Sequence, residues 1–308
     1  MANDTKTINY FYLVGIQNYK SINILLFIVF LTTYMVTLTG DFLIAILVTK
    51  SHRLQYPMFY FLKHLSVSEL LFTSNITPNM LYIILSGGGF MSLAGCIIQF
   101  YIYSALGTVE SLLLSVMSYD RYLAICNPLR YANMMNLQFC RTLVLSSWLL
   151  SLTCSFITIT LLCQLRFCGS KVIDHYLCDF APLVDLACSE SDTSIVRVEI
   201  VVLAIPIVVS MFSFIIWTYV RIFITIFRIS STTGRKKTFS TCSSHLASVC
   251  SFYGPLIIIY MVPYRKDSLN VNKYVSILYT VVTPLFNPLI YSLRNEELRH
   301  VLWKLLKR

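Results

Sequence analysis

The sequence predicts an all-α membrane protein, a seven-transmembrane helix bundle followed by a short amphipathic C-terminal helix. Its 308 residues are 56% hydrophobic and 12% charged, whereas soluble domains average roughly 45–50% and about 25%. A soluble fold could not bury this much apolar surface, so lipid must solvate it. Seven long apolar stretches follow one another, and Asp120-Arg121-Tyr122-Leu123 closes the third. A charged pair at the end of a membrane helix indicates a polar network or a cytosolic partner.

Each stretch can cross a bilayer as a helix, which needs about 20 mostly apolar residues. An open sheet would leave unpaired backbone groups in hydrocarbon, so the spans are expected to be helical. The second stretch is the weakest because Lys63, His64 and Glu69 interrupt it. The expected spans are 22–49, 58–85, 93–122, 141–163, 197–228, 237–263 and 271–293.

The basic residues predict the orientation. With the N-terminus outside, sixteen Lys and Arg residues fall on the inner side and eight on the outer side, as the positive-inside rule requires. We therefore expect a multi-pass plasma-membrane protein with an extracellular N-terminus (1–21), a seven-transmembrane domain (22–293) and a cytoplasmic tail (294–308). Residues 1–21 lack a signal-peptide core, so the first helix is expected to act as an uncleaved insertion signal. Asn3-Asp4-Thr5 in the outer segment matches a glycosylation acceptor.

The C-terminal tail predicts contact with lipid, whereas the net charge does not predict contact with nucleic acid. Apolar residues recur at helical spacing in the tail with basic residues between them, which predicts a helix lying on the anionic lipid of the inner leaflet; they are Leu298, Val301, Leu302, Leu305 and Leu306. The formal charge of +10 does not indicate nucleic-acid binding, because the basic residues are spread over short loops.

The cysteines fall into two groups by position. Cys96, Cys168, Cys178 and Cys188 map to the outer side, where disulfides persist. Cys96 begins the third span, and the other three share the long loop 166–196, so one of the three is expected to tether that loop over the outer mouth. Four cysteines allow three pairings, and spacing alone does not choose among them. The remaining six are interpreted as buried packing residues.

Three acids lie within spans at similar depth. Asp41, Glu69 and Glu110 belong to the first, second and third spans, and Asn287 of the seventh could join them. Three nearby carboxylates cannot all ionise cheaply, so they are expected to share a proton or a cation; a sodium ion at Glu69 and Glu110 is one such arrangement. A polar packing cluster between the helices explains the same three acids equally well.

Several strings, in order along nearly the whole chain, match a known family. They are Pro57-Met58-Phe59-Tyr60-Phe61-Leu62, the segments 117–126, 237–246 and 284–295, and Phe252-Tyr253-Gly254. Through them the chain resembles the olfactory (odorant) receptors, a family of rhodopsin-like (class A) G-protein-coupled receptors. The loop from Cys168 to Cys188 resembles the terrestrial-vertebrate type. Two positions depart from the family pattern: Gly40-Asp41 stands where Gly-Asn is usual, and Glu69 where Asp is common.

The resemblance implies which bonds and which switch the chain uses. It implies disulfides Cys96–Cys178 and Cys168–Cys188. It implies that Arg121 pairs with Asp120 at rest and turns toward Tyr219 and Tyr291 on activation. The switch set it implies is Asp120, Arg121, Tyr122, Tyr219, Lys236, Lys237, His245 and Tyr291. The implied partners are a small volatile odorant and a heterotrimeric G protein of the stimulatory, olfactory type, which raises cAMP; no cofactor is implied.

By the same resemblance the odorant site lies in the outer half, between the third, fifth, sixth and seventh spans. Its expected lining is mostly apolar with a few hydroxyls, which suits a small, weakly polar ligand. Glu199 is the only charged residue near that level, so amines and acids are expected less than neutral volatiles. The lining residues are Tyr103, Ser104, Gly107, Thr108, Leu203, Ile207, Tyr253, Leu256, Ile257, Tyr260, Ile277 and Thr280.

Other function classes fit the sequence less well. A transporter would show internal repeats, and the seven spans do not divide into similar halves. An enzyme would need a nucleophile and a base within reach, and no such constellation accompanies His245. We therefore expect no enzyme activity. The alternatives are a non-olfactory chemoreceptor of the same fold and, less favoured, a transporter.

Overall fold

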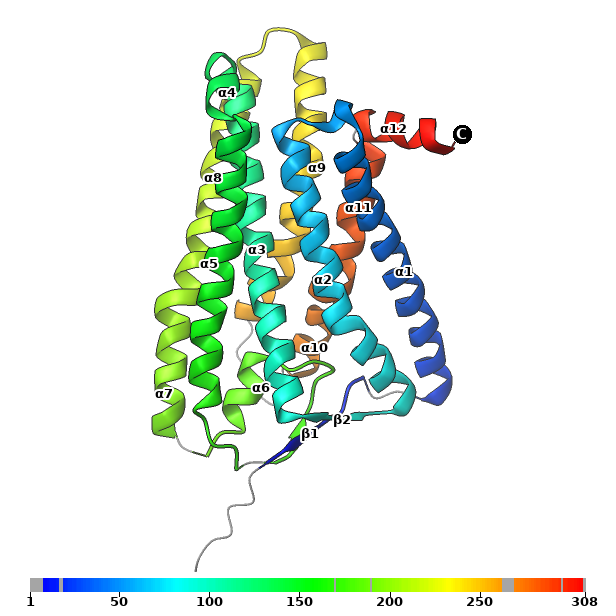
Figure 1. Ribbon diagram of the computed structural model, residues 1–308, viewed down its shortest axis with the longest axis vertical. Coiled ribbons are helices and arrows are strands. Elements are labelled where there is room, and N and C mark those ends of the chain that lie inside the picture. Colours follow the sequence, from blue (N-terminus) through cyan, green and yellow to red (C-terminus); the bar gives the residue numbers. More distant parts are fainter. Residues whose placement is uncertain are drawn as a thin grey trace, which may run out of the picture.

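Seven long helical segments stand side by side in the computed structural model, which describes residues 8–16, 19–168, 170–188, 190–261, 269–294 and 296–306 (Figure 1). In chain order the segments are α1 (Lys20–Lys50), α2 (Pro57–Ser86), α3 (Leu93–Cys126), α5 (Leu137–Cys163), α7 (Glu190–Glu199) continued by η2 (Ile200–Ala204) and α8 (Ile205–Phe227), α9 (Thr232–Met261), and α10 (Leu269–Ile277) continued by η4 (Leu278–Val282) and α11 (Thr283–Arg294).

Shorter elements close the two ends of the bundle. At one end, called the outer end below, lie α6 (Phe180–Asp185) and the strands β1 (Tyr10–Leu13), β2 (Gly89–Ser92) and β3 (Val172–Ile173). At the opposite, inner end lie η1 (His52–Leu54), α4 (Pro128–Met134) and α12 (Glu296–Leu306). The first described strand and the last described helix are therefore at opposite ends (Figure 1).

The sequence explains where several helices begin and end. Pro57 occupies the first helical position of α2, where its missing N–H costs nothing. Gly87 ends that helix in the left-handed conformation (φ 71°), which a side chain would disfavour. Ser92 caps α3 by accepting a bond from the Gly95 N–H at 3.1 Å, and Asn136 caps α5 through the Phe139 N–H at 2.8 Å.

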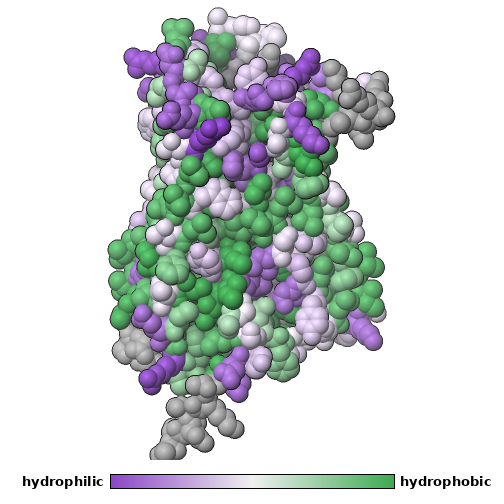
Figure 2. Space-filling model, viewed as in Figure 1, coloured by the Kyte–Doolittle hydropathy of each residue, from purple (hydrophilic) through white to green (hydrophobic). Residues whose placement is uncertain are grey.

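The outer surface of the bundle is apolar. Six helical stretches in the described part are long and apolar enough to cross a membrane, and α2, which carries Lys63, His64 and Glu69, is not among them. Large apolar side chains such as Leu149, Val202 and Trp217 point outward. Hydrophobic side chains cover much of the body, whereas hydrophilic ones gather toward the inner end (Figure 2). This distribution is that of a protein whose surrounding solvent is lipid.

A small sheet at the outer end was not predicted. Its strand order is β2-β1-β3, with Tyr10 opposite Ser92 in the antiparallel pair and Tyr12 opposite Val172 in the parallel one. Phe11 and Leu13 of β1 are fully buried beneath it. Such short strands pair across a large sequence separation, so local patterning reveals only the alternation of Phe11 and Leu13.

Close packing between α1 and α11 depends on Gly40. A Cβ added there would lie 2.9 Å from Cβ of Pro288. Gly40→Val is therefore expected to lower the free energy of unfolding by about 1–3 kcal/mol, the usual cost of overpacking. The melting temperature of the purified protein measures the loss. Gly254→Ala is the control, because a Cβ there meets no atom within 4 Å; an equal loss in both variants would contradict this account.

Candidate functional site

A cavity of about 170 Å³ lies in the outer half of the bundle. Helix α3 forms one wall, α5 a second, and the α7–η2–α8 segment a third; α9, η4 and the loop at α6 complete it. Both π-helical segments contribute, since Leu203 belongs to η2 and Tyr279 to η4. The lining residues are Phe100, Tyr103, Ser104, Gly107, Thr108, Ser111, Cys154, Ser155, Thr158, Asp179, Phe180, Glu199, Ile200, Leu203, Ala204, Ile207, Val208, Phe252, Leu256 and Tyr279.

Seven of the twelve sequence-predicted ligand residues line this cavity. They are Tyr103, Ser104, Gly107, Thr108, Leu203, Ile207 and Leu256. Gly107 makes room for Tyr279, since a Cβ at position 107 would overlap the Tyr279 hydroxyl. The third, fifth and sixth spans each contribute predicted residues to the lining of the cavity.

Four other predicted residues lie elsewhere. Tyr253 is buried and hydrogen-bonds Ser111 at 2.7 Å, and Thr280 hydrogen-bonds Tyr176 at 2.9 Å. Ile257 is 39% exposed, and Ile277 packs against the main core. The side chain of Tyr260 lies outside the described residues. Tyr253 therefore supports the lining residue Ser111 instead of lining the cavity itself.

Sequence reasoning missed one whole wall of the cavity. Cys154, Ser155 and Thr158 of α5 line it, as do Asp179 and Phe180 of the outer loop. The regular spacing of small and hydroxyl residues at positions 147, 151, 155 and 158 of that span, which are buried, was the available signal. Glu199, which the sequence placed near this level, lines the cavity, and Asp179 adds a second carboxylate that the sequence did not lead us to expect.

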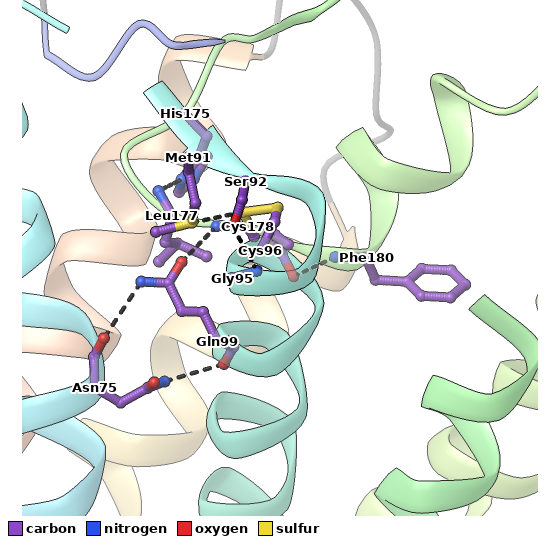
Figure 3. The surroundings of a disulfide bond; sticks show 11 residues. Asn75, Met91, Ser92, Gly95, Cys96, Gln99, His175, Leu177, Cys178 and Phe180 are labelled. Atoms are coloured by element: carbon purple, nitrogen blue, oxygen red, sulfur yellow. Dashed lines mark hydrogen bonds between the residues drawn. A yellow bond between two sulfur atoms is a disulfide. The ribbon is translucent and has the colours of Figure 1, made fainter. Parts of the chain in front are cut away.

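The outer loop is tied to α3 beside the cavity (Figure 3). Cys96 and Cys178 form a disulfide with Cα atoms 5.4 Å apart, and Cys168 and Cys188 form a second one at 4.8 Å. The Gln99 side chain accepts a bond from the Cys178 N–H at 3.0 Å and donates to the Asn75 carbonyl at 3.3 Å. The loop is thereby fixed to both α3 and α2, as expected of a lid.

A buried lysine links three segments at the outer end. Lys273 of α10 donates to the Gly15 carbonyl at 2.9 Å and pairs with Asp174 at 2.5 Å. Next to Asp174, the His175 ring is 6% exposed, and its Nδ1 accepts a bond from the Leu177 N–H at 3.3 Å. The N-terminal segment, the outer loop and the seventh span thus meet at one contact.

Acid is expected to loosen this contact through His175. Burial, with a smaller effect of Lys273, lowers the pKa of His175 from 6.5 to about 3. The folded protein therefore keeps the ring neutral, while the unfolded chain takes up a proton below about pH 6.5. Stability from this group is complete above that pH and is lost as the pH falls toward 3. The melting temperature should drop more in the wild type than in His175→Asn between about pH 7.5 and about pH 5.5; equal drops would contradict the assignment.

The four polar residues expected at one depth do come together. Asp41, Glu69, Glu110 and Asn287 are each at most 2% exposed. Asn287 donates to Glu69, and Asp41 and Glu110 lie close enough to Glu69 to interact with it electrostatically. Both Asp41 oxygens, Glu69 Oε2 and Glu110 Oε1 lack a hydrogen-bond partner in the described part. Among the described residues no group of three or more His, Cys, Asp or Glu is placed to hold a metal ion.

At the inner end, Arg121 pairs with Asp120 at 3.0 Å. Asp120 is fully buried and also accepts a bond from the Tyr131 hydroxyl of α4 at 2.8 Å. Tyr122 packs against Trp217 of α8, with ring centroids 5.3 Å apart. The carboxylate thus holds both the arginine of its own helix and the adjoining short helix, a role of Tyr131 that the sequence did not reveal.

His245 of α9 links this helix to α3 and α8, on the outer side of the Asp120–Arg121 pair. Its Nε2 lies 3.1 Å from the Leu114 carbonyl of α3, and its Nδ1 lies 2.7 Å from the Tyr219 hydroxyl of α8. A carbonyl only accepts, so Nε2 carries the proton and Nδ1 accepts from Tyr219. Tyr291 of α11 is buried. Any shift of α9 therefore changes bonds to α3 and α8.

The inner ends of α8 and α9 border an open groove. It is lined by Phe223, Ile226, Phe227, Arg235, Lys236, Phe239, Ser240 and Ser243. The Lys236 side chain is exposed there. The side chain of Lys237 and all of Asn3 lie outside the described residues.

Comparison with known proteins gives the family. A family model described as olfactory receptor matches residues 30–308. The human olfactory receptor 11L1 is 42% identical over 305 residues, covering 99% of this chain and 94% of that relative. The mouse olfactory receptor 5P60 is 42% identical over 293 residues, covering 95% and 90%. The crystal structure of squid rhodopsin matches with a TM-score of 0.74 at 16% identity, covering 95% of this chain and 87% of that one, which confirms the predicted fold class.

Proposed function

The chain belongs to the olfactory receptor family, and on that premise we propose that it is an odorant-activated receptor that couples to a stimulatory, olfactory-type G protein and raises cAMP. Family membership makes it a multi-pass membrane receptor of the G-protein-coupled class and not an enzyme. The proposal concerns its G protein, its ligand site and its mechanism.

One observation supports the proposal above the others: helix α3 carries both sites. Gly107 and Thr108 line the outer cavity, and Arg121 forms the inner ion pair. Arg121 lies fourteen positions after Gly107, which is about 21 Å along the helix at 1.5 Å per residue. One helix therefore connects the outer cavity to the ion pair between Asp120 and Arg121 at the inner end of the bundle. This ion pair is called the latch below.

In the proposed mechanism a small volatile ligand occupies the cavity and draws α8 and α9 toward α3. The movement changes the bonds that His245 makes to Leu114 and Tyr219. Arg121 then leaves Asp120 and turns toward Tyr219 and Tyr291. The inner end of α9, with Lys236, moves outward and opens a cleft for the G protein. Such a two-state change needs the ligand to bind the open state more tightly than the closed one.

The proposed orientation places the outer end outside the cell. Both disulfides lie at that end, where an oxidising environment preserves them, and α12 lies at the other end. We place α12 against the inner leaflet, with Arg299 and Trp303 facing lipid headgroups, and Asn3 in the glycosylated outer segment. For the buried acids we propose a shared proton or a sodium ion at Glu69 and Glu110, because Glu69 Oε2 and Glu110 Oε1 lack a hydrogen-bond partner among the described residues.

A cAMP assay tests the function directly. Cells expressing the chain with the olfactory-type stimulatory G-protein α-subunit are exposed to a panel of volatiles. At least one volatile is expected to raise cAMP in a dose-dependent way, and the rise should vanish when that α-subunit is omitted. Responses that persist without any stimulatory α-subunit, or none from a receptor shown to be at the cell surface, would contradict the proposal.

A further inference from the structure

The outer cavity contains an unsatisfied carboxylate. Glu199, the last residue of α7, lines the cavity. Its Oε1 accepts a bond from the Thr158 hydroxyl of α5 at 2.9 Å, and this bond orients the carboxylate. Its Oε2 is buried and has no hydrogen-bond partner in the described part of the chain. A buried acceptor without a donor is unfavourable, so an occupant that supplies a donor is favoured.

A second acidic side chain lies in the cavity. Asp179 also lines it, and one of its oxygens accepts a bond from the Phe180 N–H at 2.7 Å. That bond caps the first turn of α6, so this oxygen of Asp179 is already occupied. The described lining residues include no Lys, Arg or His. No protein cation among them neutralises the two acids.

Aromatic rings line the same cavity and can attract a cation. Phe100, Tyr103 and Phe180 line the cavity, with the Phe100 and Phe180 ring centroids 6.4 Å apart. The face of an aromatic ring attracts a cation within about 6 Å of its centroid. An apolar protein cavity of about 150 Å³ binds benzene, and this cavity of about 170 Å³ is of similar size. Its occupant is therefore a small molecule with few non-hydrogen atoms.

We propose that the cavity selects small primary amines, whose ammonium group donates to Glu199 Oε2 while the alkyl chain packs among the apolar and aromatic walls. This inference rests on the proposed function, because it names the ligand class of the same site. It reverses the expectation from sequence, which placed amines behind neutral volatiles before the two carboxylates were seen together. An alcohol of equal length also donates a hydrogen bond, but it carries no charge for the carboxylates and rings to attract.

Thermal stabilisation of the purified full-length receptor tests the proposal without the G protein. Straight-chain primary amines of four to seven carbons are compared with the alcohols of the same length. Because a ligand that binds only the folded state stabilises it in proportion to RT ln(1 + [L]/Kd), each amine is expected to raise the melting temperature with an apparent Kd about tenfold or more below that of its alcohol. Equal affinities, or binding of alcohols alone, would overturn the proposal.

Three variants assign the effect to Glu199. Glu199→Gln keeps the shape and removes the charge, so the amine Kd should rise about tenfold or more while the alcohol Kd changes less than about threefold. Thr158→Val removes the positioning hydroxyl and should reduce the amine-to-alcohol preference in the same direction. Asp185→Asn is the matched control, because that acid is exposed and pairs with Arg197 outside the cavity. An unchanged amine Kd in folded Glu199→Gln protein would overturn the assignment.

The two proposals fail in different ways. If amines bind the purified receptor but no volatile raises cAMP in cells, the proposed function fails and the ligand class stands. If neutral volatiles raise cAMP and amines neither bind nor activate, the ligand class fails and the proposed function stands.

Discussion

Replacing Arg121 by alanine is expected to reduce agonist-driven cAMP production to less than about a tenth of the wild-type level, since coupling free energies of roughly 1–3 kcal/mol correspond to about 5–150-fold. Arg121 pairs with Asp120 at 3.0 Å in this structure, and in the proposed open state it bridges to Tyr219 and Tyr291. Alanine removes both arrangements. The measurement is cAMP at saturating agonist, corrected for receptor at the cell surface.

Two further variants separate the latch from a general loss of positive charge. Arg141→Ala removes an exposed arginine at the beginning of α5 and should leave the response intact. Asp120→Asn weakens the closed state alone, so it should raise agonist-independent cAMP by a few-fold, as expected when a minor state gains population. A full response in Arg121→Ala, or lower basal activity in Asp120→Asn, would contradict the latch.

The second large effect is expected from the disulfide that anchors the lid. The double variant Cys96→Ala/Cys178→Ala should be less stable by about 2–5 kcal/mol, the usual result of removing a native disulfide, and should largely fail to reach the cell surface. Both cysteines are fully buried, and Cys178 also donates its N–H to Gln99. Surface staining and the melting temperature of whatever protein is recovered measure the loss.

Cys168→Ala/Cys188→Ala provides the comparison. This bond closes a loop within the lid, with a sequence separation of 20 against 82 for the other, and both of its cysteines are exposed. Its loss should loosen the lid without detaching it from α3. A larger defect in this variant than in Cys96→Ala/Cys178→Ala would show that the tether to α3 is not the main anchor.

The sequence predicts the helical bundle well because the signal is local. Long apolar runs predict the spans. The ion pair between the adjacent residues Asp120 and Arg121, which the family resemblance implied, is present in the structure. The helices extend past several expected spans: α1 begins at Lys20 and α3 ends at Cys126, compared with expected bounds of 22 and 122. Helix α5 also begins earlier than expected, at Leu137 instead of 141, where Asn136 caps its first turn through the Phe139 N–H.

The features that sequence did not reveal depend on contacts between distant segments. Tyr12 pairs with Val172, and Lys273 meets Gly15 and Asp174, so no window of neighbouring residues shows these contacts. Glu199 looks isolated along the chain, and only the fold brings Asp179 and the α5 hydroxyls to the same cavity. Two predicted ligand residues in the sixth and seventh spans, Tyr253 and Thr280, directly adjoin the lining residues Phe252 and Tyr279. Their depth was right, but their side chains lie on another face of the helix, which the sequence of a wholly apolar span does not mark.

The most direct test of the account is the distance between probes on the inner ends of α4 and α9. Probes are attached at Arg130→Cys and Lys236→Cys, both exposed positions, in a background where exposed Cys163 and Cys250 are replaced by serine. The account predicts that an agonist from the odorant screen, added with the G protein, lengthens this distance by several Å, and that Asp120→Asn lengthens it partly without agonist. A distance that stays the same while cAMP rises would contradict a mechanism in which the outer ligand opens the inner cleft.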